Sequence, residues 1–220
     1  MPYLAIDTAS RWTALALYDA DRDEILAEKG WTATQRQTVE LAPSLEQMLA
    51  DRALSAADLT ALVVAIGPGS YTGLRIGLSL ARGIAAVHQL PIAAIQTHDI
   101  VAANIPADER PLYVTVEAGR KRVLVAPYRW EGERWEQLGE ITNPTWLELI
   151  ESIDRPIMIA GEIPAELRTD RTLAPNRIEF ISEDLSRRSA AVLAQLGHRQ
   201  IMAGQLPDQR RLAPNYINSP

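Results

Sequence analysis

Hydrophobic and polar positions along the chain follow two periods, and the order in which these periods occur repeats once. Apolar residues that alternate with polar ones, or that form a short run between polar turns, predict a strand, and apolar residues that recur every three or four positions predict a helix. In the first half, the expected elements are strands at 3–8, 12–18 and 24–32, a helix at 36–51, a strand at 61–66, a helix at 72–89, a strand at 91–95 and a short helix at 99–104.

The second half gives the same succession, beginning again with three strand-like segments separated by polar turns. The elements expected after them are a helix capped by Thr145 that runs to Ile153, a strand at 156–161, a short helix at 163–168, a strand at 177–181 and a long helix at 186–203. Gly204 follows the long helix as a typical stop. The proline-containing tail after it is expected to be extended.

The two halves overlay without a gap when the sequence is shifted by 110 residues. Tyr3–Asp7 then lies over Tyr113–Glu117. Tyr18 lies over Tyr128, and each polar turn leads into a strand that carries a tryptophan. Agreement in residue class, length and turn placement is expected of a duplicated unit.

A three-stranded antiparallel meander followed by helix, strand and helix, used twice, indicates an α/β fold of the actin, sugar-kinase and Hsp70 type. In that fold, two ribonuclease-H-like lobes face each other across a cleft. The segment NIPADERP at 104–111 is the best boundary in the sequence, so we expect an N-terminal lobe at 1–104 and a C-terminal lobe at 105–220. The last long helix is a candidate to pack back on the N-terminal lobe.

The segment GPGSYTGLRIG at 67–77 joins a predicted strand to a predicted helix and has two interpretations. A glycine-rich turn before a helix can present backbone N–H groups to a phosphate, which makes Gly69 and Ser70 candidate ligand-binding residues. The spacing G-x-G-x-x-x-G matches neither the dinucleotide signature nor the P-loop, and this argues against a phosphate cradle.

Close helix packing is the second interpretation. Gly73, Gly77, Ala81 and Ala85 recur every four residues and so share one face of the helix. A glycine inside a helix costs about 1 kcal/mol relative to alanine, so a smooth face needs a compensating close contact. We expect this face to dock another protein. Packing does not account for Arg75, because a cation near a helix start opposes the helix dipole.

Composition narrows the range of functions. The chain has 220 residues, 47% of them hydrophobic and 23% charged, as in an ordinary globular protein. No apolar run reaches the ~20 residues of a membrane helix and no signal peptide is apparent, so we expect a cytoplasmic protein without a membrane partner. The formal net charge of −6 disfavours unaided binding to nucleic acid. The absence of cysteine excludes disulfides and thiolate metal sites.

Asp7 and Glu117 occupy equivalent strand ends in the two halves and are the strongest lead to a catalytic function. Paired carboxylates that face a cleft can hold Mg²⁺ through water, which would suit a small nucleotide-dependent phosphotransferase. Alternatively, each carboxylate caps its own turn by accepting hydrogen bonds from backbone N–H groups. A peptidase fits less well, since the histidines, His88, His98 and His198, form no metal-binding pair.

Several of these segments resemble the TsaB (YeaZ) family of bacterial proteins. The resemblance rests on LAIDTAS at 4–10, GPGSYTGLRIG at 67–77, the region 36–43 and the closing P-x-Y at 214–216, and it covers nearly the whole chain. It implies a non-catalytic subunit that binds and activates TsaD, the catalytic subunit that transfers a threonylcarbamoyl group to the adenosine beside the anticodon of tRNA. It also implies a TsaE-type ATPase as a further partner, tRNA contact only through the complex, and a homodimer in isolation.

The same resemblance implies that this chain holds no cofactor or metal of its own, and that any nucleotide is shared at the subunit interface. The catalytic relative binds its metal with a His-x-x-x-His pair, whereas here His98 is followed four residues on by Ala102. No catalytic residue is therefore expected. The segments at 36–41, 117–119 and 216–218 depart from the family's usual sequences, which leaves the retention of every family contact open, above all at the tail.

The family pairs through helices of its first lobe. The predicted helices at 36–51 and 72–89 offer more apolar surface than one lobe requires, so we expect a four-helix packing with the partner. The residues predicted for this interface are Val39, Leu41, Leu45, Met48, Gly73, Leu74, Gly77, Leu78, Ala81 and Ala85. An unrelated dimeric binding module stays open as an alternative function.

Overall fold

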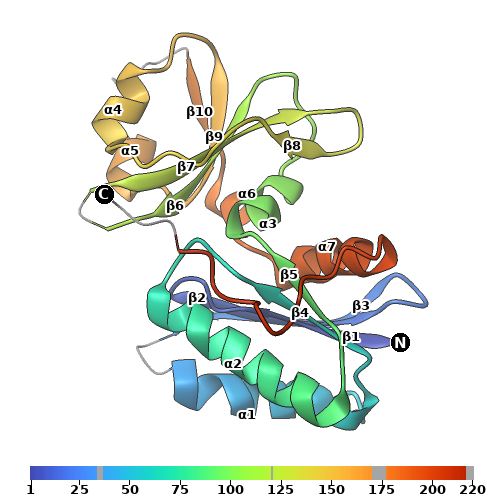
Figure 1. Cartoon of the computed structure of the whole chain (residues 1–220). Coiled ribbons are helices and arrows are strands. Elements are labelled where there is room, and N and C mark those ends of the chain that lie inside the picture. Colours follow the sequence, from blue (N-terminus) through green and yellow to red (C-terminus); the bar gives the residue numbers. More distant parts are fainter. Residues whose placement is uncertain (34–36, 120, 170–176, 217–220) are drawn as a thin grey trace. The chain divides into compact units, whose positions relative to one another are not determined.

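The chain forms two compact units in the computed structural model, which describes residues 1–33, 37–119, 121–169 and 177–216 (Figure 1). Unit 1 comprises Met1–Thr97 together with residues 188–216, and unit 2 comprises the described residues of His98–Arg187. The division falls after Thr97, ahead of the boundary predicted after Asn104, and the C-terminal segment belongs with unit 1.

Unit 1 is a five-stranded sheet with helices on both faces. Its elements are β1 (Pro2–Asp7), β2 (Trp12–Asp19), β3 (Glu24–Thr32), α1 (Gln37–Ala50), a short 3-10 helix (Ala56–Asp58), β4 (Ala61–Ala65), α2 (Tyr71–His88), β5 (Ile92–Ile95) and α7 (Ala190–Met202). The strands lie in the order β3-β2-β1-β4-β5, with β1 antiparallel to β2 and parallel to β4. Helices α1 and α2 cover one face of the sheet and α7 covers the other (Figure 1).

Unit 2 repeats this plan with shorter helices and shorter edge strands. They are α3 (Thr97–Ala103, which begins at the last residue of unit 1), β6 (Leu112–Glu117), β7 (Val123–Trp130), β8 (Trp135–Gln137), α4 (Trp146–Glu151), β9 (Ile157–Gly161), α5 (Ala165–Thr169), β10 (Ile178–Phe180) and α6 (Glu183–Ser186). The strand order is β10-β9-β6-β7-β8. One hydrophobic cluster joins α3 residues to one face of the sheet, and a second joins α4 residues to the other.

The two sheets have the same topology, which confirms the predicted duplicated α/β fold. Counted from the meander edge, β3-β2-β1-β4-β5 of unit 1 corresponds to β8-β7-β6-β9-β10 of unit 2. The gap-free overlay is wrong in one detail. Asp7 pairs with Ala14, whereas Glu117 pairs with Val123, so the first turn of unit 2 is one residue shorter.

Alternation along the strands divides the core of unit 1 between the two faces of its sheet. Ile6 of β1 belongs to the cluster that contains the core residues of α1 and α2. On the other face, the ring of Tyr3 lies 5.7 Å from that of His198 on α7. A Cβ on Gly197 of α7 would lie 2.2 Å from the Val63 side chain, so this glycine lets α7 approach β4 closely.

The long helix predicted at 186–203 is shorter in the structure, because α7 begins at Ala190 and Ser186 is the last residue of the separate short helix α6. Arg187 has an extended backbone and ends α6, and Ser189 caps α7 by accepting a hydrogen bond from the Val192 N–H at 3.2 Å. Arg188 therefore lies in an extended link rather than inside a helix. Arg36, the predicted first residue of the helix now seen as α1, lies outside the described residues, as do Ile217 and Asn218 of the tail.

Candidate functional site

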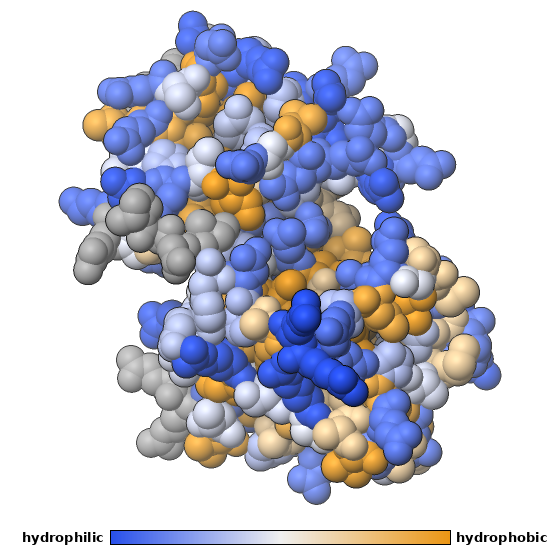
Figure 2. All heavy atoms as spheres, in the orientation of Figure 1, coloured by the Kyte–Doolittle hydropathy of each residue, from blue (hydrophilic) through white to orange (hydrophobic). Residues whose placement is uncertain are grey.

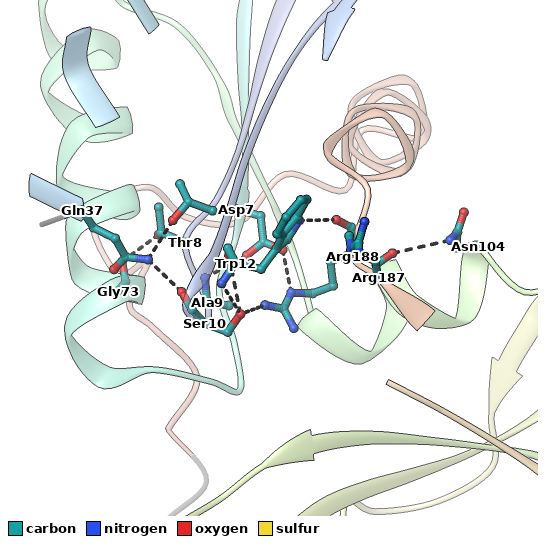
Figure 3. Close-up of polar contacts among 11 residues, drawn as sticks. Asp7, Thr8, Ala9, Ser10, Trp12, Gln37, Gly73, Asn104, Arg187 and Arg188 are labelled. Carbon is teal, nitrogen blue, oxygen red and sulfur yellow. Dashed lines mark hydrogen bonds and ion pairs between the residues drawn. The ribbon is translucent and has the colours of Figure 1, made fainter. Parts of the chain in front are cut away.

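The end of β1 holds a buried ion pair. Asp7 is fully buried, and its Oδ1 accepts a hydrogen bond from the Ala9 N–H at 2.8 Å. Its Oδ2 accepts a hydrogen bond from Nε of Arg188 at 2.7 Å, and the Arg188 side chain is only 4% exposed (Figure 3). Arg188 also donates to Oγ of Ser10, and its carbonyl oxygen accepts a hydrogen bond from the Trp12 indole at 3.2 Å. The guanidinium thus joins the β1–β2 turn to the start of α7.

This geometry bears on the two interpretations of Asp7. The hydrogen bond from Ala9 is the turn-capping contact, and the second carboxylate oxygen already faces a cation. A divalent metal at Asp7 would have to displace the Arg188 guanidinium and leave it buried without its carboxylate, which is strongly unfavourable. Sequence reasoning missed this pair because Asp7 and Arg188 are 181 positions apart and no local pattern connects them.

Glu117, the counterpart of Asp7, lies in unit 2 and has different surroundings. Its side chain is exposed, and its backbone N–H donates to Oε2 of Glu162 at 2.8 Å. Next to it is a groove of about 960 Å³ with an apolar wall that includes Trp146 and Leu167 and charged groups that include Arg122. Since Asp7 and Glu117 belong to different units, the structure does not establish the paired site that a phosphotransferase would need.

The glycine-rich segment packs against the turn that follows β1. The Ser70 N–H donates to the Ala9 carbonyl at 2.6 Å, and Oγ of Ser70 caps α2 by accepting from the Gly73 N–H at 3.1 Å. A Cβ on Gly69 would lie 2.2 Å from that same Ala9 carbonyl. The N–H groups of Ser70 and Gly73, which a phosphate cradle would require, are therefore already used within unit 1.

The face of α2 that was predicted to dock a partner is buried inside its own unit and is therefore not exposed to a partner. A Cβ on Gly73 would lie 2.0 Å from the Thr8 carbonyl, and a Cβ on Gly77 would lie 2.3 Å from Oγ1 of Thr8. Ala81 and Ala85 complete this face and are also buried. The close approach inferred from the glycines is real, but the backbone that approaches is β1 and its turn, as Figure 3 shows for Thr8 and Gly73.

Most other residues predicted for the interface are buried as well. They are buried because they lie on the sides of α1 and α2 that pack against the sheet. The buried members are Leu41, Leu45, Met48, Leu74 and Leu78. Val39 is 65% exposed, and it alone of the predicted set offers a large exposed side chain.

The opposite face of α2 is open and also carries small residues. We call it the outer stripe: Thr72, Ile76, Ser79, Gly83 and Val87, at spacings of three and four. Its Ser79 and Gly83 are exposed, and no heavy atom lies within 4 Å of a Cβ built on Gly83. The first three members help to line a groove of about 520 Å³ between α1 and α2.

The groove between α1 and α2 is lined mainly by apolar and hydroxyl side chains. The lining residues are Thr38, Leu41, Ala42, Tyr71, Thr72, Arg75, Ile76, Ser79 and Leu80. Arg75 is the only charged residue among them. An open groove between two helices suits an apolar helix from another protein. Hydrophilic side chains cover much of the visible surface of each unit, with hydrophobic groups between them (Figure 2).

No metal centre accompanies these features within the described part of the chain, where no three His, Asp or Glu side chains lie close enough to hold an ion. His98 lies in the first turn of α3 and is fully buried, with Nε2 3.3 Å from the Leu124 carbonyl. Among the described helices, none is both long and apolar enough to cross a membrane.

Comparison with known proteins identifies the family. A family model described as TsaD, tRNA N6-adenosine threonylcarbamoyltransferase, matches residues 30–145. The tRNA threonylcarbamoyladenosine biosynthesis protein TsaB of Bacillus subtilis is 32% identical over 164 residues, which cover 73% of this chain and 71% of that protein. The chain belongs to the TsaB (YeaZ) family. The resemblance found in the glycine-rich and N-terminal segments is thereby confirmed.

Further TsaB relatives agree with this assignment. The TsaB protein of Escherichia coli is 33% identical over 97 residues, 44% of this chain and 41% of that protein. YeaZ from Pseudomonas aeruginosa superposes with a TM-score of 0.75 over 98% of this chain and 100% of that chain, at 19% identity. At 19% identity, this structural match supports the fold alone. The matched region includes residues of both units.

Proposed function

We propose that this chain is a non-catalytic subunit that binds and activates a TsaD-type subunit for threonylcarbamoyl transfer to the adenosine beside the anticodon of tRNA. The observation that carries the proposal is the open groove between α1 and α2 in a member of the TsaB family. Both carboxylate oxygens of Asp7 already accept hydrogen bonds within unit 1, which supports a subunit without a catalytic carboxylate at the end of β1. A TsaE-type ATPase and a homodimer in the absence of the partner belong to the same proposal.

The proposed contact uses the outer stripe and the groove rather than the buried glycine face. A partner helix can approach closely over Ser79 and Gly83, because neither side chain projects far from the helix. Burial of apolar area from both proteins then favours the complex, offset in part by the freedom that both proteins lose on association. A TsaD-type subunit would be held in its active conformation by this contact, and tRNA would meet the assembled complex.

Reconstitution of the modification reaction tests this proposal. We expect threonylcarbamoyladenosine to form when a TsaD-type subunit, its ATPase and the activated substrate are combined with this chain, and to fall to background without it. Ser79→Arg places a bulky charge in the groove, so it should abolish both activity and co-elution of the two subunits in size-exclusion chromatography with light scattering.

The matched control is Ala107→Arg, which adds the same charge at an exposed position of unit 2. It should leave complex formation and activity unchanged. Equal activity with and without the chain would contradict the scaffold role. Co-elution of the Ser79→Arg variant with the partner would show that the docking surface lies elsewhere.

A further inference from the structure

Arg75, which packing of α2 does not explain, meets the closing P-x-Y segment of the chain. Its Nε donates a hydrogen bond to the Tyr216 hydroxyl at 2.9 Å, across 141 positions of sequence. The Arg75 guanidinium carbon also lies 3.8 Å from the ring centroid of Tyr71, and the two tyrosine rings are 4.9 Å apart. We call these three residues the Arg75 cluster.

The C-terminal segment reaches the cluster because it is anchored along α2 by other contacts. The Asn215 N–H donates to the Ile66 carbonyl at 2.6 Å, and Leu212 is buried. Arg82 of α2 donates to the carbonyl oxygens of Gln209 and Leu212. These contacts place Tyr216 next to Arg75 even without the hydrogen bond between the two side chains.

The Arg75 cluster lies at the rim of the groove between α1 and α2. Tyr71 and Arg75 line the groove, and Tyr71 is 55% and Tyr216 is 37% exposed. Among the described residues, no carboxylate forms an ion pair with Arg75. Arg75 lies one turn into α2, and its guanidinium is held there by the two tyrosine rings and the Tyr216 hydroxyl.

We propose that Arg75 receives a carboxylate of the TsaD-type partner, and this inference rests on the proposed function. The Tyr71 ring, whose centroid lies 3.8 Å from the guanidinium carbon, restrains Arg75, and within the described part of the chain only Nε of its guanidinium makes a hydrogen bond. A guanidinium fixed in this way can bind a carboxylate with two parallel hydrogen bonds. Tyrosine and arginine are also the residue types most enriched where interfaces carry most of their binding energy.

Charge complementarity defines the partner's chemistry. Apart from Arg75, the groove is lined by apolar and hydroxyl side chains, so a fitting occupant is a largely apolar helix with one Asp or Glu placed to meet Arg75. The net charge of −6 repels carboxylates at long range, and a single local cation then also selects the register in which the helix docks.

The test measures the dissociation constant of the full chain with a purified TsaD-type subunit by calorimetry. Arg75→Gln keeps hydrogen-bond donors but removes the charge, and we expect roughly tenfold or greater weakening together with loss of the salt dependence shown by the unmodified chain. Arg75→Lys should restore the salt dependence but not the full affinity, since Lys cannot form two parallel bonds. Tyr216→Phe should weaken binding by a smaller factor, because the ring remains.

Arg22→Gln is the matched control, because Arg22 is an exposed arginine of unit 1 whose loss should leave binding unchanged. Unchanged affinity and salt dependence of Arg75→Gln, with Ser79→Arg still preventing binding, would overturn the inference and leave the proposed function standing. Loss of only the homodimer in Arg75→Gln would also overturn it, since the carboxylate would then come from a second copy. Unchanged binding in both variants would instead refute the docking surface itself.

Discussion

Both faces of α2 carry glycine, but the two faces meet different environments. On the inner face, Gly73 and Gly77 have no room for a Cβ, because Thr8 lies directly against them. On the outer stripe, Gly83 has open space where its Cβ would be. Glycines at helical spacing therefore do not by themselves mark an interface. The inner glycines are required by a neighbour within the unit, whereas the outer glycine leaves surface that another protein can cover.

The inner face of α2 lies next to the end of β1, where Asp7 and Arg188 form a buried ion pair. The largest loss of stability is expected from breaking this pair. Arg188→Ala would leave the Asp7 carboxylate buried and without its cation, and we expect a loss of about 3–5 kcal/mol in the free energy of unfolding. Urea unfolding measures this. Arg22→Ala is the control: its ion pair with Asp19 spans 3.8 Å and Arg22 is 74% exposed, so its removal should change stability by less than about 1 kcal/mol. Similar losses of unfolding free energy in the two variants would mean that the Asp7–Arg188 pair is not buried as described.

Alanine at the inner glycines is expected to have the next largest effect. Gly73→Ala places a methyl group against the Thr8 carbonyl, which belongs to the backbone and cannot rotate away. Even after the gain in helix propensity of about 1 kcal/mol, we expect a net loss of about 1–3 kcal/mol in unfolding free energy. Gly77→Ala should lose less, because its obstacle is the Thr8 hydroxyl on a rotatable side chain. Denaturant midpoints of both variants would decide this order, and the reverse order would contradict it.

The smallest effect is expected on the outer stripe and has the opposite sign. Gly83→Ala meets no neighbour and removes conformational freedom from the unfolded chain, so it should stabilise the isolated protein by about 0.5–1 kcal/mol. A rise in the thermal midpoint measures this gain. Destabilisation of the monomer by Gly83→Ala would show that the outer stripe is covered within the chain itself, and the contrast between the two faces would then fail.

The fold could be predicted because its signals are local. Alternating strands and helical spacing identified most elements, and the repeated order of elements indicated two copies of one unit. The overlay erred by one residue at the first turn, since strand patterns do not fix the length of the loop between them. The predicted helix at 186–203 hid a break at Arg188, because a helical pattern of apolar residues does not reveal a side chain that is needed elsewhere.

The candidate site was only partly predictable, because its contacts join distant parts of the chain. Sequence spacing grouped Gly73 with Gly77, but it could not tell which face of the helix meets the sheet. Arg75 stood out as unexplained, yet its partner Tyr216 lies at the other end of the sequence. The same holds for Asp7 and Arg188. Contacts of this kind depend on where the C-terminal segment returns, and no local pattern encodes that path.

The return of the C-terminal segment to unit 1 has a consequence for synthesis on the ribosome. The strands of the first sheet leave the exit tunnel early, but α7, which covers one of its faces, is translated only after the whole of unit 2. Domains usually fold as they emerge, N-terminal first. Here one apolar face of the nascent sheet stays uncovered until α7 has been translated. Unit 1 is thus the first part of the protein to be made and the last to be completed.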